Sequence, residues 1–380
     1  MVRDDHPDAP LELVSSGAAG PARQAALPTP RGPLTEALFA RWNHAPEPRV
    51  DASLVAAGET VGHDDPLDDG DLQLALYCCW ELSYRGFRGV HPAWEECTST
   101  FQLRRDLGRR MEDALRGLTA GSGTDPLRYL EGLLRGSAPS LSAFLLDAER
   151  LDWFLEFLVH RAPYQSKEAD PHSWGLPRLE GLPKAAMVEI QSDEYGAGRP
   201  GHAHADLFAA TLRAAGLDDS YGAWVDHVPA VTLATTNLIS HLGASRRLVP
   251  ALAGHLALFE MTSVGPMARY AELCDRLALG AQARRFFDVH VEADDHHGPL
   301  ARTRLVGGLL AQDPGCGGEI VFGVAALDVV ERRLAEHLRR SWTAGRTSLR
   351  LPLAATGRSS PDAEASGATD AAAGTPARVA

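Results

Sequence analysis

The sequence predicts an all-α protein: one helical bundle with an N-terminal helical extension and disordered tails. Apolar residues recur at helical spacing at Leu72, Leu76, Trp80 and Tyr84. A longer stripe with the i, i+3, i+4, i+7 pattern of an amphipathic helix contains Phe144, Leu145, Ala148, Leu151, Phe154, Leu155 and Leu158. Strand-like alternation is nearly absent, with weak exceptions at 188–191 and 228–233. Further helices are predicted at 181–195, 203–216, 245–262, 266–279, 280–297 and 319–343.

Composition excludes several classes of protein. The hydrophobic content of 44% is that of a chain with a packed core. The sequence contains no run of eighteen apolar residues, so we expect no membrane span. The first thirty residues do not have the pattern of a signal peptide, so we expect a cytoplasmic protein. A net charge of -13 argues against a nucleic-acid partner, because phosphate binding requires clustered Lys and Arg. The five cysteines are odd in number and form no C-x-x-C pair, which predicts reduced thiols.

Local composition suggests three segments. Residues 1–66 are predicted to be a mostly disordered N-terminal segment and linker, residues 67–352 a helical domain, and residues 353–380 a disordered tail. Within the first segment, the apolar piece 34–42 predicts one helix, and the acidic, Pro- and Gly-bearing stretch 46–70 predicts a linker. We expect that residues 1–30 and 355–380 do not pack on the core, because they lack an apolar period.

The sharpest local signal is the run HVEADDHH at 290–297. On an α-helix, residues i, i+4 and i+7 share one face, so His290, Asp294 and His297 should project together. Two imidazoles and a carboxylate are a ligand set that suits non-haem iron. The alternative is a solvated acidic helix face, although the phenylalanines at 286–287 indicate that one face is buried.

A second candidate is Glu260, which follows the apolar run LALF. A carboxylate among Leu and Phe is costly to bury unless it is paired or bound to a cation. The alternative is that Glu260 emerges into water at the end of its helix.

A third candidate region joins two predicted helices. Acids stand near glycines and histidines there, and a bent junction would let Glu194 and His204 converge. His202 would face elsewhere on a helix, although an exchange of roles with His204 stays open. The glycines at 196 and 198 do not form a phosphate loop, because no strand precedes them and the G-x-G-x-x-G form is missing.

These stretches resemble the haem-oxygenase-like diiron oxidases, also described as iron-containing redox enzymes. The resemblance rests on SKEADPHSWGLPRL, VEIQSDEYGAGRPGHAHADLF, the Glu260 helix and FFDVHVEADDHH, and it covers roughly residues 70–345. In that family the ligand order is Glu, then Glu and His, then Glu, then His-x-x-x-Asp-x-x-His. The residues that match this order, and on which the resemblance implies catalytic and metal-binding roles, are Glu168, Glu194, His204, Glu260, His290, Asp294 and His297. Some members have a further Glu where this chain has Gly201, which would leave a coordination position to water or weaken the second iron site.

The resemblance implies a haem-oxygenase-like helical bundle with two Fe(II) ions and dioxygen as co-substrate. It implies N-oxygenation, desaturation or C–C cleavage of a small organic molecule, in secondary metabolism. The expected partners are that substrate and an electron donor of unknown identity, without nucleic acid or membrane, and a homodimer is a candidate assembly. Because metal-bound histidines usually donate their second N–H, we also consider acceptors for those groups. The candidates, each also compatible with ordinary packing, are Tyr164, Tyr195, Asp193 and Asp206.

Two rival classes stay open. A metal-free or haem-binding protein of the same fold would need few carboxylates in its core, whereas this chain is expected to place four there. The second class is non-catalytic and contains a ferritin-like iron store or a degenerate protein. An iron store would carry Glu-x-x-His twice, and the proposed site contains no such motif. A degenerate protein without oxidase activity is favoured by Gly201, and measuring bound iron and consumed dioxygen would distinguish it from an oxidase.

Overall fold

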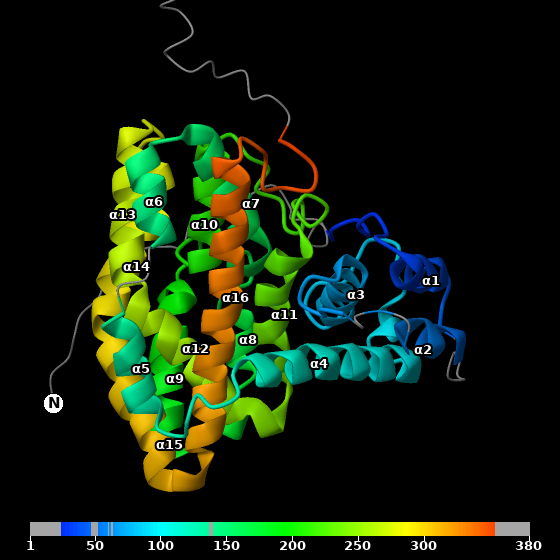
Figure 1. Cartoon of the computed structure of the whole chain (residues 1–380), viewed down its shortest axis with the longest axis horizontal. Coiled ribbons are helices and arrows are strands. Elements are labelled where there is room, and N and C mark those ends of the chain that lie inside the picture. Colours follow the sequence, from blue (N-terminus) through cyan, green and yellow to red (C-terminus); the bar gives the residue numbers. More distant parts are fainter. Residues whose placement is uncertain (1–23, 47–51, 60, 62–63, 137–139, 354–380) are drawn as a thin grey trace, which may run out of the picture.

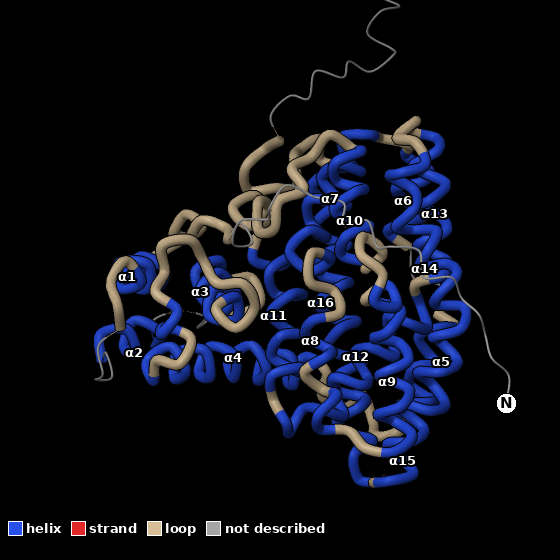
Figure 2. Tube along the Cα trace, turned by 180° about the vertical axis from the view of Figure 1, so that it is seen from behind, coloured by secondary structure: helices blue, strands red, loops and turns tan. Residues whose placement is uncertain are grey.

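The computed structural model describes residues 24–46, 52–59, 61, 64–136 and 140–353, and it contains helices and no strand within those residues. The prediction of an all-α fold is therefore confirmed. A small group of N-terminal helices lies beside a larger bundle, and the long helix α4 runs from one to the other (Figure 1). The tube view from behind shows the same two parts and the same connecting helix (Figure 2).

The N-terminal extension consists of α1 (Pro33–Trp42), α2 (Ala52–Glu59), α3 (Gly70–Glu81) and α4 (Thr98–Leu118). Buried Asp71 ties α1 to α3, because its carboxylate accepts hydrogen bonds from the backbone N–H groups of Leu34 and Thr35. At the start of α3, the Asp69 side chain accepts from the backbone N–H groups of Asp71 and Leu72, which satisfies two of the free donors of the first turn. Helix α3 then packs on α11, which joins the extension to the bundle.

Two expectations for the N-terminal segment are wrong. The stretch 46–70, predicted to be a linker, contains α2, where Leu54 is buried against the core. Residues 24–30, expected not to pack, lie on the folded part: the Ala25 carbonyl accepts from the Arg88 N–H, and Pro28 is buried. Apolar side chains in both stretches find a hydrophobic surface that the local composition does not reveal. Helix α1 confirms the helix predicted at 34–42, whereas the tails 1–23 and 354–380 lie outside the described residues.

The bundle begins with α5 (Pro126–Leu134), α6 (Leu141–Ala148) and α7 (Leu151–Gln165), followed by the short α8 (Asp170–Ser173). The apolar stripe over 144–158, predicted to be one helix, is divided between α6 and α7. Glu149 between them has a left-handed backbone, with φ 48, which ends α6 and redirects the chain. The two helices pack on different neighbours, since α6 contacts α13 and α7 contacts α10 and α11.

The remaining helices are α9 (Gly181–Glu194), α10 (His204–Ala214), α11 (Ala230–Ala244), α12 (Val249–Thr262), α13 (Val264–Arg276), α14 (Ala281–Leu300), α15 (Gly307–Gln312) and α16 (Gly317–Thr343), with a π-helix at Ala301–Val306. All six helices predicted in this part of the sequence are present. The strand-like runs at 188–191 and 228–233 lie in α9 and at the start of α11 instead. Helix α11 is buried along almost its whole length, so its apolar residues do not follow a single face of the helix.

Helices α12 and α16 meet at two glycines. A Cβ added to Gly323 would lie 1.8 Å from the Ala251 carbonyl oxygen, and one added to Gly254 would lie 2.2 Å from the Ile320 carbonyl oxygen. Only glycine permits such a close backbone approach, because any other residue would place a side chain inside the neighbouring helix. This contact fixes the position of α12, the helix that carries Glu260.

No single helix within the described ranges has the length and apolar composition to cross a membrane, although the bent pair Arg246–Thr262 and Val264–Arg276 passes that test together. All five cysteines are free, which agrees with the prediction of reduced thiols.

Candidate metal centre

The seven predicted ligands come from four helices and one turn. Glu168 lies in the turn between α7 and α8, Glu194 ends α9, and His204 begins α10. Glu260 lies near the end of α12. The face predicted for the helix at 290–297 exists in α14, where His290, Asp294 and His297 are all buried.

The junction between α9 and α10 brings Glu194 and His204 together. The backbone has positive φ at Gly196, Ala197, Gly198 and Gly201, which turns the chain back within a few residues. A Cβ at Gly196 would lie 2.4 Å from the His202 carbonyl carbon, so the turn requires glycine at this position. Nδ1 of His204 consequently lies 3.0 Å from Oε2 of Glu194, whereas His202 is exposed.

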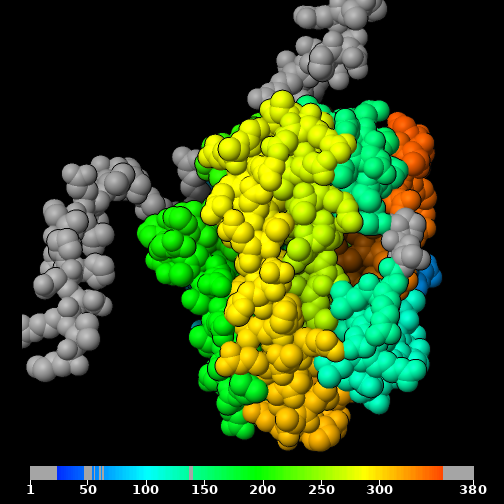
Figure 3. Space-filling view, turned by 90° about the vertical axis from the view of Figure 1, so that its left-hand side faces the viewer, coloured from blue at the N-terminus to red at the C-terminus, as the bar shows by residue number. Residues whose placement is uncertain are grey.

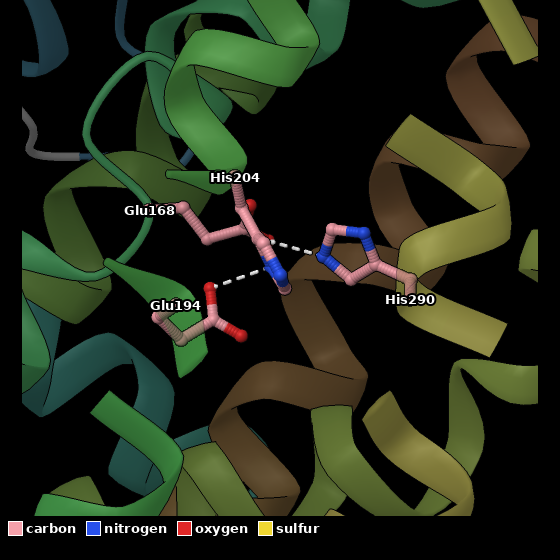
Figure 4. Close-up of side chains that lie close together, drawn as sticks. All are labelled: Glu168, Glu194, His204 and His290. Atoms are coloured by element: carbon pink, nitrogen blue, oxygen red, sulfur yellow. Dashed lines mark ion pairs between the residues drawn. The ribbon is translucent and has the colours of Figure 1, made fainter. Parts of the chain in front are cut away.

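Six of the seven side chains form two groups that share Glu194. In the first group, Glu168, Glu194, His204 and His290 each offer one ligand atom, and these atoms lie within 4.8 Å of one another. Figure 4 shows these four side chains converging, with His290 facing Glu168 and His204 facing Glu194. In the second group, Glu194, Glu260 and His297 do the same.

Asp294 lies beside the second group. Its Oδ1 is 3.8 Å from Nδ1 of His297, and its Oδ2 accepts a hydrogen bond from the Ser263 hydroxyl. Asp294 also lines the small cavity of about 40 Å³ that Glu168, Glu194, Glu260 and His290 line. Five of the seven side chains therefore line this cavity, and His204 and His297 are connected to them through the two groups.

Hydrogen bonds on the outer side of the cluster orient two imidazoles. Nδ1 of His290 donates to the Phe286 carbonyl at 2.9 Å, which directs Nε2 at Glu168. Nε2 of His297 donates to the Asp193 carboxylate at 3.0 Å, which leaves Nδ1 directed at Glu260 and Asp294. This is the arrangement of metal-bound histidines, in which the second N–H is held by an acceptor.

Among the outer residues considered from sequence, only Asp193 contacts a predicted ligand histidine in this way. Sequence reasoning did not identify Gln165, whose amide, in the orientation that satisfies both of its ends, donates to both Glu168 oxygens at 2.7 Å. It also did not identify Ser263. Gln165 ends α7 three residues before Glu168, and this spacing could have indicated that the two side chains are neighbours.

Burial and the density of charge displace the pKa values of the cluster. Burial alone would lower the pKa of His290, but Glu168, Glu194 and Asp294 outweigh it and raise the pKa to about 10. Burial would likewise lower the pKa of His297, but Asp294, Glu260 and Asp193 raise it to about 11. Burial, with Asp294 and Glu194, raises the pKa of Glu260 to about 8. Without metal, protons therefore supply the positive charge that these carboxylates require.

The unsatisfied polar atoms of the cluster are a second indication that these residues fit a metal ion. Five buried atoms in the cluster form no hydrogen bond and face other predicted ligands: Glu194 Oε2, His204 Nδ1, Glu260 Oε2, His290 Nε2 and His297 Nδ1. Buried polar atoms are rarely left unpaired, because desolvation without a partner costs about 1–3 kcal/mol each. All five belong to predicted ligands and lie within the two groups. Carboxylate and imidazole donors of this kind suit iron.

Metal-binding helical bundles hold their ions with carboxylate and histidine side chains that project from facing helices into the core. The two groups described above have this arrangement. Residues 155–330 match the model of the family described as iron-containing redox enzyme. The chain is also 27% identical over 237 residues to the nitrosourea synthase of Streptomyces achromogenes subsp. streptozoticus. That alignment covers 58% of this chain and 50% of the relative, so the chain spans about half the length of the curated relative that it matches.

Proposed function

We propose that this protein is a non-haem diiron oxidase that uses dioxygen to oxidise a small organic substrate. The observation that carries the proposal is the set of five unpartnered buried donor atoms, shared between two groups that meet at Glu194. Two ferrous ions bound there would each supply one electron for the reduction of dioxygen. The seven ligands would be Glu168, Glu194, His204, Glu260, His290, Asp294 and His297.

The protein's own residues would hold and shield this centre. Glu194 belongs to both groups, so its carboxylate would help to hold both ions. The Phe286 carbonyl and Asp193 fix the rings of His290 and His297, so their free nitrogens need no reorientation when an ion binds. Gly201 lies in the exposed turn before α10, so this chain has no Glu-x-x-His pair there, and a coordination position would be left to water.

A second cavity is the proposed substrate-binding site. It has a volume of about 490 Å³, and it shares Arg161, Gln165, Phe259, Ser263 and Met267 with the small cavity at the metal centre. Figure 3 shows the surface hollowed between the yellow helices α13 and α14 and the teal helices α5 and α6, with orange α16 at the floor. We call this cavity the chamber.

The chamber is mostly apolar. Phe157, Phe208, Phe286 and Phe287 contribute rings to its wall, and charged side chains enter it mainly from α7 and α16 as the pair Arg161–Glu331, at 2.8 Å, and the pair Asp328–Arg332, at 2.9 Å. An apolar wall favours a substrate with an apolar body, since burial of that body contributes about 25 cal/mol per Å². The reaction would be N-oxygenation, desaturation or C–C cleavage. Because the relative is a nitrosourea synthase and a nitroso group contains an oxidised nitrogen, N-oxygenation is the first to test.

The test begins with metal analysis of full-length protein loaded anaerobically with ferrous iron. We expect two iron ions per chain in the wild type and fewer in His204→Ala. The control His202→Ala changes an exposed histidine two residues away and should retain both ions. Dioxygen consumption is then measured with a panel of amines and aliphatic acids.

Substrate-dependent oxygen uptake that requires loaded iron would support the proposal. If no iron binds, the protein is a metal-free relative. If iron binds but no substrate stimulates oxygen uptake, a degenerate binding protein is the better description.

A further inference from the structure

A buried ion pair lies next to the metal centre and outside it. Nζ of Lys167 is 2.6 Å from Oε2 of Glu81, and each side chain is only 1% exposed. Lysine is almost never fully buried unless it is paired, and this chain has only two lysines, Lys167 and Lys184. A buried ion pair is weak evidence for stability, because desolvation of both charges offsets their attraction. Its presence here therefore calls for another reason.

The lysine is held on several sides. Its Nζ lies 4.2 Å from the ring centre of Tyr84 and 4.6 Å from that of Tyr77. Tyr84 is itself fixed, since it stacks on Trp174 at 4.7 Å and its hydroxyl lies 3.0 Å from the Ser240 hydroxyl. Glu81, Tyr77 and Tyr84 all lie at or near α3, so the N-terminal extension provides most of this cage. These three residues also precede 155–330, the part of the chain that matches the family.

The ion pair is linked to the metal centre through the backbone, because Lys167 directly precedes the predicted ligand Glu168. Oε1 of Glu168 lies 3.6 Å from Nε2 of His290. Glu194 and Glu260 are held by regular helices, but Glu168 lies in the turn between α7 and α8. The placement of Glu168 consequently depends on what anchors that turn. The Lys167 side chain reaches α3 from it, whereas the Glu168 side chain lines the metal cavity.

We infer that the Lys167–Glu81 pair is a positioning device for Glu168, through which the N-terminal extension sets the geometry of the metal centre. This inference rests on the proposed function, in which Glu168 is an iron ligand. Lys167 and Glu81 are positioning residues and touch neither substrate nor metal. Residues outside a metal's own ligands typically change metal affinity 10- to 100-fold when they are removed, and this range is the expected effect.

The experiment compares Glu81→Gln and Lys167→Met with wild type in the full chain. Cobalt(II) and iron(II) are titrated anaerobically, and the Co(II) absorption bands report the coordination of each ion. We expect affinity at the group containing Glu168 to fall at least about tenfold, with changed Co(II) bands, while the group containing Glu260 keeps its affinity. Lys167→Arg, which retains the charge, should recover part of the loss.

The matched control is Glu112→Gln. Glu112 is another buried carboxylate in the part of the chain that the structure describes, paired at 2.8 Å with His241; it lies in α4 and does not line the cavity at the metal centre. This variant should lose thermal stability but keep both metal affinities. The double variant Glu81→Leu with Lys167→Met removes both charges and keeps the site apolar, so it separates loss of folding from loss of positioning.

Two results would overturn the inference: unchanged metal affinity in Lys167→Met, or a double variant in which affinity returns together with stability. Glu168→Ala tests the underlying premise separately. If Glu168→Ala binds both ions normally, the assignment of Glu168 as a ligand fails. If Glu168→Ala loses an ion but the pair variants do not, only the positioning role is wrong.

Discussion

Nδ1 of His297 lies 3.3 Å from Oε2 of Glu260, and neither atom has a hydrogen-bond partner. The two side chains come from α14 and α12, which pack against each other. A shared cation would satisfy both atoms, and a cation held by His290 and Glu168 would satisfy Nε2 of His290. The centre therefore divides into two halves that substitutions can separate.

His290→Ala should remove the ion of the Glu168 half, and His297→Ala the ion of the Glu260 half. Each variant should bind about one iron ion where the wild type binds two, because the group that is not mutated keeps all of its ligands. Metal analysis after anaerobic loading and desalting measures this, with thermal unfolding as the check on folding. Two ions retained in both variants would mean that these histidines are not ligands.

Asp193→Ala should weaken metal binding about 10- to 100-fold, because His297 loses the acceptor that fixes its ring. Asp193 is half exposed, so its removal leaves no buried cavity. Asp206→Ala is the matched control, since Asp206 is an exposed acid of the neighbouring helix α10. Equal affinity in both variants, measured by competition with a coloured chelator, would remove Asp193 from the centre.

Ala335→Phe should narrow the chamber without disturbing the metal ligands. Ala335 lines the chamber from α16, so we expect iron loading to be unchanged and kcat/KM to fall for bulky substrates more than for small ones. Differences of one or two methylene groups in an apolar pocket change discrimination roughly 10- to 200-fold. Ala281→Phe, at an exposed position of α14, is the control. A uniform loss for all substrates would place the substrate elsewhere.

Gly323→Ala should destabilise the bundle by about 3 kcal/mol or more, because the new methyl group would overlap the Ala251 carbonyl and separate α12 from α16.

Gly117→Ala should instead increase the free energy of unfolding. Gly117 lies in α4 with open space around it, and alanine should stabilise that helix by roughly 0.5–1 kcal/mol. Urea unfolding of the metal-free proteins measures both. Similar midpoints would show that α12 can shift to accept the methyl group.

The metal-free protein should lose stability as pH falls from about 6.5 toward 3, partly through His160. Burial lowers the pKa of His160 to about 3, while its pKa in the unfolded chain is about 6.5. Between these values the unfolded state binds a proton that the folded state does not, so unfolding is favoured as pH falls.

His160 lies between the hydroxyls of Thr232 and Ser348, at 2.6 and 3.0 Å. His160→Gln should reduce the slope of unfolding free energy against pH by up to about 1.4 kcal/mol per unit. His202→Ala, at an exposed position, should leave the slope unchanged. A variant slope equal to that of the wild type would show that His160 also becomes protonated in the folded protein.

The sequence alone determined the features that depend on short-range periodicity. The spacing of His290, Asp294 and His297 places them on one face of a helix wherever that helix packs, because 3.6 residues complete a turn. The glycines between Glu194 and His204 likewise predict a sharp reversal, since glycine permits the positive φ that the turn requires. The all-α class follows from the same local patterns.

Tertiary structure decided what depends on contacts between distant segments. Nothing near Lys167 in the sequence indicates that Glu81 is its partner, and nothing near Asp193 indicates that it holds His297. The break at Glu149 and helix α2 also escaped prediction, because the packing surfaces that favour them are built by other parts of the chain. Local pattern fixes which face a side chain occupies on its own helix, whereas the neighbour that this face meets depends on the packing of the whole bundle.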